Sequence, residues 1–253
     1  MILGLLTLAE WSGRLWWLWA WGALVLFQSV MMVLGPVVIL PLFNKFTPLP
    51  EGPLRERLMD LARKTHFLAR SIQVMDGSKR SKHSNAFFTG FGRFRKIVLF
   101  DTLIAQLTEP ELAAVLAHEI GHDRKGHLLQ TLLVGLAGLL GGCFLLGWLA
   151  DADWFYRAFG FPPGQRSVAF LLFGLLAGPV TFWLSPLVSL WSRRFEYQAD
   201  AFAAETMGEG GSLIGALRKL NEKNLSNLIP HPLYSAFYYS HPTLLEREQA
   251  LRD

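Results

Sequence analysis

The chain is 253 residues long, with 51% hydrophobic and only 17% charged residues. An ordinary soluble domain carries about 25% charged residues, so this composition excludes a typical soluble protein and predicts an integral membrane protein. The net charge of +4 can serve membrane orientation. Because no nucleic-acid-binding motif accompanies it, we expect no nucleic-acid partner. The single cysteine, Cys143, excludes an intrachain disulfide and argues against a cysteine-based metal site.

Three apolar stretches are long enough to cross a membrane, since a helical span needs about 20 residues. These predicted spans are residues 15–42, 128–150 and 167–191. The first contains Gly35-Pro36, where we expect a kink. Residues 1–10 lack a positive region and a cleavage site, so they do not resemble a signal peptide. The expected fold class is a mainly α integral membrane protein with about three transmembrane helices.

Residues 44–126 have a globular composition. Apolar residues at helical spacing predict an amphipathic helix over residues 51–70. The strand candidates are residues 71–75, 85–89 and 96–100. Gly90 and Gly92 lie between the last two candidates and indicate a turn there. We expect these strands to form a small β-sheet beside the helix that follows them.

The pattern of residues 108–125 predicts one continuous helix. Thr108 and Glu111 have the spacing of a capping box, and Pro110 lies in the first turn, where its missing N–H costs nothing. Further along the helix, apolar residues recur at helical spacing and should bury one side: Leu112, Val115, Leu116 and Ile120. We leave open whether Gly126 breaks this helix before the second span.

Within this helix lies the sequence His118-Glu119-Ile120-Gly121-His122, an HExxH motif. Residues four apart share a helix face, so both imidazoles point the same way and can bind one zinc ion. Glu119 is placed to act on water at the open metal position as a general base. The alternative is a chance match with two ordinary surface histidines.

A catalytic zinc site takes three protein ligands, so the two histidines need a partner. Residues 192–208 continue the third span as a helix, and we expect Glu196 in that helix to be the third ligand. Asp200, one turn later, suits an acceptor that fixes an imidazole tautomer. The alternatives are a solvated Glu196 paired with Arg193, and an ordinary surface aspartate at position 200.

The remaining histidines show no ligand spacing. His127 follows His122 by five residues, about 140° around a helix, so we expect it to face away from the metal at the membrane interface. His241 precedes Pro242, which favours an extended conformation. Three others are expected to be structural or solvated: His66, His83 and His231.

Charge placement predicts the topology. Most lysines and arginines lie in residues 44–126 or after residue 191, whereas the 151–166 loop has only Arg157 and Arg166. We therefore expect the catalytic segments to be cytoplasmic in a multi-pass protein. The predicted organisation is an N-terminal transmembrane segment (1–43), a first metallopeptidase part (44–126), a transmembrane hairpin (127–191) and a second metallopeptidase part (192–253).

Six ordered blocks carry a family resemblance: residues 41–52, 75–92, 97–104, 115–127, 192–203 and 240–248. With these blocks the chain resembles the type I CAAX prenyl proteases, integral-membrane zinc metallopeptidases of the gluzincin group. The resemblance implies a zincin-like metallopeptidase domain in which zinc is bound by His118, His122 and Glu196. It also implies that Glu119 is the base and that Asp200 supports a ligand. Asn85 and His241 would contact the substrate or its developing oxyanion.

The resemblance further implies that residues 85–90 form an edge strand that holds an extended peptide by backbone pairing. Members of that family have additional N-terminal spans and a seven-helix chamber. With three predicted spans, we expect a truncated or minimal form, or a chamber completed in another way.

The function we expect is that of a zinc-dependent endopeptidase acting on a peptide or protein substrate, which can be prenylated, in contact with membrane lipid. One alternative is a quality-control protease similar to the heat-shock membrane metallopeptidases. Another is a non-catalytic membrane scaffold, although the intact HExxH motif and Glu196 argue against it.

Overall fold

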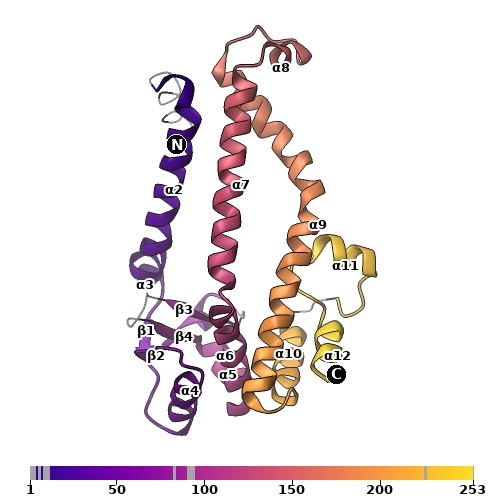
Figure 1. The fold of residues 1–253 in the computed structure, drawn as a ribbon. Helices are drawn as coiled ribbons and strands as arrows, with labels where there is room; N and C mark the ends of the chain where they lie inside the picture. Colours follow the sequence, from indigo (N-terminus) through magenta and orange to yellow (C-terminus); the bar gives the residue numbers. More distant parts are fainter. Residues whose placement is uncertain are drawn as a thin grey trace. The chain divides into compact units, whose positions relative to one another are not determined.

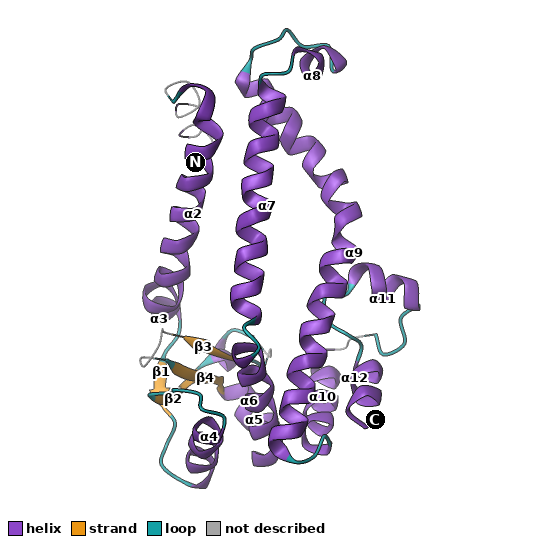
Figure 2. Cartoon of the chain, viewed as in Figure 1, coloured by secondary structure: helices purple, strands orange, loops and turns teal. Residues whose placement is uncertain are grey.

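The computed structural model describes residues 4, 7, 12–81, 84–89, 95–224 and 227–252. The chain forms two compact units, one from residues 1–32 and 129–185 and the other from residues 33–128 and 186–253. We call them the helical unit and the site unit. Figures 1 and 2 show that strands occur only in the site unit among the described residues.

The helical unit is built from long apolar helices. Its elements are η1 (Gly13–Leu15), α2 (Trp16–Leu34), most of α7 (His127–Ala150), α8 (Asp153–Ala158) and the first part of α9 (Arg166–Met207). Trp16 of α2 is buried with Phe155 and Tyr156 of α8 and with Ala169 of α9. The Trp21 indole N–H donates to the carbonyl of Leu136 at 3.2 Å. These contacts join α2, α7, α8 and α9 into one packed cluster.

In the part of the chain that the structure describes, three helices are long and apolar enough to cross a membrane, and they confirm the predicted spans. They cover Gly13–Phe43, His127–Ala150 and Arg166–Met207. The first is interrupted by η2 (Gly35–Ile39), a π-helical turn at the expected Gly35-Pro36 kink, and ends with α3 (Leu40–Phe43). Such turns are a recognised cause of helix kinks. The short helix α8 in the 151–166 loop was not predicted.

The site unit contains a four-stranded sheet in the order β1-β2-β4-β3. Its strands are β1 (Phe46–Pro48), β2 (Ser71–Met75), β3 (Ala86–Thr89) and β4 (Lys96–Phe100). β2 and β4 are parallel, while β1 pairs antiparallel with β2 and β3 with β4. The three predicted strands are confirmed and β3 lies at the sheet edge, whereas β1 was missed because it is short and ends in proline. The predicted turn at Gly90 and Gly92 lies outside the described residues.

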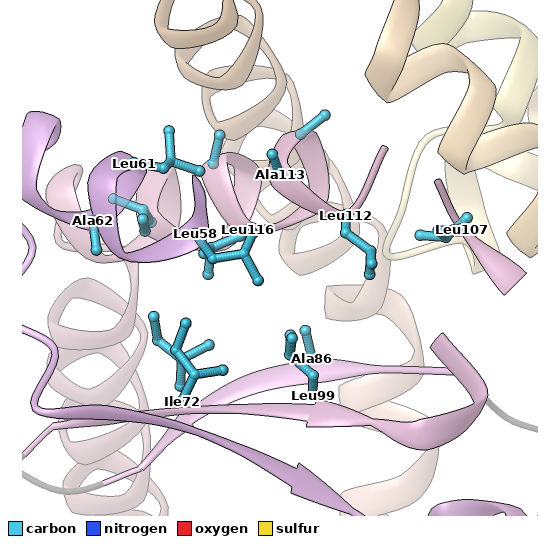
Figure 3. Close-up of a cluster of buried hydrophobic side chains, with 14 of the residues drawn as sticks. Leu58, Leu61, Ala62, Ile72, Ala86, Leu99, Leu107, Leu112, Ala113 and Leu116 are labelled. Carbon is cyan, nitrogen blue, oxygen red and sulfur yellow. The ribbon is translucent and has the colours of Figure 1, made fainter. Parts of the chain in front are cut away.

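The core of the site unit lies between the sheet and two helices, α4 (Pro53–Lys64) and α6 (Glu109–Arg124). Figure 3 shows Leu58 of α4 and Leu116 of α6 facing Ile72 and Leu99 of the strands. The helix predicted over residues 51–70 was wrong at its end. It stops at Lys64 because His66 adopts a left-handed conformation with φ 54°, which continues no right-handed helix.

The other helices of the site unit are α5 (Asp101–Gln106), α10 (Gly211–Asn224), α11 (Pro232–Tyr238) and α12 (Leu244–Arg252), with the 3-10 turn η3 (Gly77–Lys79). Leu213 and Ala216 of α10 join the core beside α6. The predicted helix over 192–208 is the end of α9, which runs without interruption from Arg166 to Met207. Two long helices, α6 and α9, thus carry the predicted metal ligands.

Candidate metal centre

The helix that carries the HExxH motif begins where the sequence predicts. The carboxylate of Glu111 accepts from the Thr108 backbone N–H at 2.7 Å, and the reciprocal capping bond is present. Glu111 is buried and also accepts a hydrogen bond from Lys219 of α10 at 2.6 Å. The cap satisfies backbone donors at the start of α6, and the link to α10 holds this end against the core. The helix α6, which positions His118 and His122, is therefore held in place at its N-terminal end.

Gly121, inside the motif, allows α9 to approach α6 closely. A Cβ atom at Gly121 would lie 3.1 Å from the Cα of Ala199 and 3.2 Å from the Cβ of Phe202. Only a residue without a side chain leaves room for this separation of the two backbones. The close approach puts Glu196 and Asp200 of α9 within reach of the histidines.

The three predicted ligands converge. The Nε2 atoms of His118 and His122 are 3.2 Å apart. The Glu196 carboxylate lies 3.6 Å from Nε2 of His118 and 3.5 Å from Nε2 of His122. One ligand atom from each residue falls within a group spanning 4.8 Å, a geometry that could hold a metal ion.

These spacings suit zinc. With zinc–ligand distances of about 2.0–2.2 Å, the ligand atoms of a tetrahedral site lie about 3.3–3.6 Å apart. His118 donates from Nδ1 to Asp200 at 2.8 Å, so its Nε2 carries a lone pair toward the Glu196 carboxylate. Two acceptors facing each other inside a protein repel unless a cation lies between them. The donor set therefore fits a bound cation, and imidazole with carboxylate suits zinc.

Asp200 occupies the supporting position that was predicted. It is 2% exposed, and it accepts from Nε and Nη2 of Arg247 at 2.7 and 2.5 Å in addition to His118. Arg247 also lies 3.4 Å from Glu196. A single guanidinium from α12 therefore neutralises two carboxylates on α9 and limits the cost of burying them.

His241 lies in the segment before α12 and contacts Glu196. Its Nδ1 lies 3.1 Å from Glu196, while the side chain remains 66% exposed. The hydrogen bond to Glu196 raises the pKa of His241, and burial only partly opposes this shift. The structure thus places His241 beside Glu196 in the cavity, with its imidazolium form stabilised relative to that of a free histidine.

Glu119 and Asn85 line the same cavity of about 420 Å³ as His118, His122 and His241. Burial raises the pKa of Glu119, and the charge of Glu196 adds to the shift although His118 opposes it. Asn85 precedes β3 and accepts from the N–H of Ala86 at 2.8 Å. The predicted site residues other than Asp200 therefore line one cavity, and Asp200 lies behind His118.

The prediction for His127 was wrong. It is 2% exposed, and its Nδ1 lies 3.0 Å from Nδ1 of His122. The predicted angle assumed an unbroken helix, but Gly126 has φ 68° and separates α6 from α7. The chain changes direction there, which returns His127 to the side of His122. Burial, with the neighbouring His118, lowers the pKa of His122 to about 4.

Sequence reasoning also missed the parts played by Arg247 and by Gln198, whose side chain contacts His127 at 2.9 Å. Gln198 lies two residues after Glu196 and has no local signal of its own. Arg247 lies within the block 240–248 that carried the resemblance. Its helix position alone could not show that it reaches α9.

Comparison with known proteins decides the family. The model of Peptidase family M48 matches residues 48–253. The chain belongs to peptidase family M48. A second family model, "CAAX prenyl protease N-terminal, five membrane helices", matches residues 1–45. The chain is therefore an integral membrane member of this metallopeptidase family, and the predicted resemblance is confirmed.

Several relatives of this M48 protein are named CAAX prenyl protease 1 or its homologue. One from Oryza sativa subsp. japonica is 44% identical over 240 residues, covering 93% of this chain and 56% of the relative. Another from Saccharomyces cerevisiae is 40% identical over 240 residues, covering 88% of this chain and 53% of the relative. The chain thus spans about half the length of these curated relatives.

The fold also resembles that of a solved structure. The crystal structure of S. mikatae Ste24p matches with a TM-score of 0.84 and 39% identity, covering 94% of this chain and 59% of that chain. This match confirms the predicted fold class of a mainly helical membrane protein with a small sheet.

Proposed function

We propose that this M48 protein is a zinc-dependent integral-membrane endopeptidase that cleaves prenylated CAAX-type substrates. The observation that carries the proposal is the convergence of His118, His122 and Glu196 around one point, with Glu119 in the adjoining cavity. The names of the relatives support the substrate class. Family membership and an intact ligand set argue against the scaffold alternative.

Zinc would be held by His118, His122 and Glu196, and when bound it would polarise the scissile carbonyl and acidify a water molecule. Glu119 would take a proton from the attacking water and return it to the leaving amine. Its raised pKa favours this exchange, because a base works best when its pKa approaches the working pH. Glu119 needs no metal contact for this role.

His241 and Asn85 would act on the substrate. The raised pKa of His241 favours the imidazolium form, which can donate a hydrogen bond to the negative charge that develops on the carbonyl oxygen. Asn85 lies directly before the edge strand β3 and can donate from its amide to the substrate backbone. An extended peptide would pair with β3, so that both side chains lie beside the scissile bond.

The lipid on the substrate would add affinity. The three candidate spans place apolar helices in the same chain as the site, and burying a prenyl group contributes about 0.8 kcal/mol per CH₂. Peptides with a prenyl group should therefore be cleaved better than the same peptides without it.

Orientation and organisation form part of the proposal. Arg124, Lys125, Arg193 and Arg194 lie next to the spans, which favours a cytoplasmic location for the catalytic segments. The division into segments 1–43, 44–126, 127–191 and 192–253 follows from this topology. A reporter in the 151–166 loop should lie on the membrane side opposite to one at the C-terminus. Finding both reporters on one side would contradict the proposed hairpin.

The decisive experiment combines metal analysis of the purified protein with a cleavage assay. Zinc close to one equivalent and faster cleavage of a prenylated CAAX peptide than of the bare peptide are expected. Equal rates for the two peptides would contradict the lipid preference. Faster cleavage of an unfolded membrane protein, irrespective of lipid, would support the quality-control alternative. A protein that binds no metal would overturn the zinc mechanism.

A further inference from the structure

We propose that His127 is a positioning residue that holds His122 in the tautomer needed to bind the metal. His127 accepts the Nδ1 proton of His122, which leaves the lone pair of His122 on Nε2, the atom at the ligand group. The inference rests on the proposed zinc site. It concerns His127, which belongs neither to the HExxH motif nor to the predicted carboxylates of α9, Glu196 and Asp200.

The position of His127 depends on the helix break at Gly126. With φ 68° at Gly126, α6 ends at Arg124 and α7 begins at His127. A straight continuation would have carried His127 about 140° away from His122. Because the chain turns, the rings of His122 and His127 instead lie with centroids 5.0 Å apart at 77°.

The hydrogen bonds around His127 determine which of its ring nitrogens donates and which accepts. Its Nε2 lies 2.9 Å from Oε1 of Gln198, an amide oxygen that can only accept. His127 therefore donates from Nε2, and its Nδ1 in the neutral ring is an acceptor. The 3.0 Å contact between Nδ1 of His127 and Nδ1 of His122 then requires His122 to donate. A neutral His122 that donates from Nδ1 has its lone pair on Nε2.

Packing holds the His127 ring in place. The ring stacks on Phe195 with centroids 4.0 Å apart and planes at 10°, and Phe195 in turn contacts Trp191 at 4.7 Å. Only 2% of His127 is exposed, so water cannot readily replace its hydrogen bonds. Phe195 and Gln198 flank Glu196 on α9, so one helix segment supplies a ligand and also fixes the ring that supports another.

The two histidine ligands are thus supported in different ways. His118 donates to the carboxylate of Asp200 at 2.8 Å, whereas His122 donates to a neutral imidazole. A carboxylate partner makes an imidazole a stronger ligand. The neutral partner orients His122 without adding a further negative charge to a group that already contains Glu119, Glu196 and Asp200.

The test measures zinc affinity by chelator competition on the full chain in lipid nanodiscs. His127→Leu removes the acceptor, whereas His127→Asn keeps an oxygen close to the position of Nδ1. Loss of such a supporting partner typically lowers metal affinity about 10–100-fold. We expect that loss for the leucine variant and near wild-type affinity for the asparagine variant. His66→Asn, an exposed histidine outside the site, serves as the matched control.

Gln198 provides a second, independent arm if His127→Leu does not fold. Gln198→Leu removes the acceptor that sets the His127 tautomer, and Gln198→Glu restores an acceptor there. We expect weaker zinc binding in the first variant and recovery in the second. The visible spectrum of the cobalt-substituted protein should change in the leucine variants and not in the restoring ones.

The outcomes separate this inference from the proposed function. A wild-type protein that binds no zinc would overturn the proposed function. Wild-type zinc binding with unchanged affinity in His127→Leu would overturn only the positioning role. Equal losses in His127→Leu and His127→Asn would also overturn it, because packing and not hydrogen bonding would then explain the effect.

Discussion

Only Lys125 and Gly126 separate α6 from α7, yet the two helices differ in how much of their surface is buried. In α6 most residues are buried, including the polar His118 and Glu111. In α7 many large apolar side chains are exposed, as with Leu133 at 56%. An apolar surface on a candidate span can face lipid, whereas the buried apolar side chains of α6 pack in the core of the site unit. Substitutions should therefore have large, position-dependent effects in α6 and small effects in α7.

The largest expected effect is on catalysis within α6. Glu119→Gln should abolish peptide hydrolysis while zinc content stays at the wild-type level, because in the proposed mechanism Glu119 serves as the base and does not hold the metal. Removing a general base typically costs about 10²–10⁴-fold in rate. Parallel turnover and metal measurements check this, and turnover at the wild-type rate would contradict the mechanism.

The second-largest expected effect is on zinc binding by α9, the helix that approaches α6 closely at Gly121. Glu196→Ala should lower zinc occupancy strongly, since two imidazoles leave the site one ligand short. Asp200→Asn should have a smaller effect, about 10–100-fold in zinc affinity, because it removes a supporting partner and not a ligand. Metal analysis after dialysis against a weak chelator ranks the two variants. Unchanged zinc content in Glu196→Ala would reassign the third ligand.

The third comparison tests stability directly. Leu116→Ala in α6 should lower the free energy of unfolding by about 2–5 kcal/mol, because the side chain is fully buried against the sheet. Leu133→Ala in α7 should change it by no more than about 0.5 kcal/mol, as is usual for exposed positions. Thermal unfolding in one detergent gives both values. Similar losses in the two helices would show that α7 is packed as closely as α6.

The smallest expected effect is the change in zinc affinity when a helix glycine is replaced by alanine. At Gly121 an alanine Cβ would meet the backbone of Ala199 at 3.1 Å, whereas Gly138 in α7 has no atom within 4 Å of that position. Both substitutions gain about 0.5–1 kcal/mol of helix stability. In Gly121→Ala the two backbones must separate by a few tenths of an ångström, so zinc affinity should fall modestly. Gly138→Ala should leave zinc affinity unchanged, and equal affinity in both variants would remove the role assigned to Gly121.

The sequence predicted the features that depend on local periodicity. The three spans, the strands β2, β3 and β4, and the capping box at Thr108 all rest on composition or on spacing within one element. Two features that the sequence did not predict correctly, β1 and the end of α4, also have local causes. β1 is three residues long, and α4 ends early because His66 takes a left-handed conformation that its residue type does not announce.

The sequence by itself determined which side chains could form the site. His118, Glu119 and His122 followed from their spacing, Glu196 and Asp200 from their place in the helix after the third span, and Asn85 and His241 from the resemblance. Only the tertiary structure decided how they are supported. Arg247 reaches Asp200 from α12, and His127 returns to His122 because Gly126 ends a helix. Spacing within a helix fixes directions only as long as the helix continues. Contacts between distant segments depend on how the whole unit packs, and no single stretch of sequence specifies that packing.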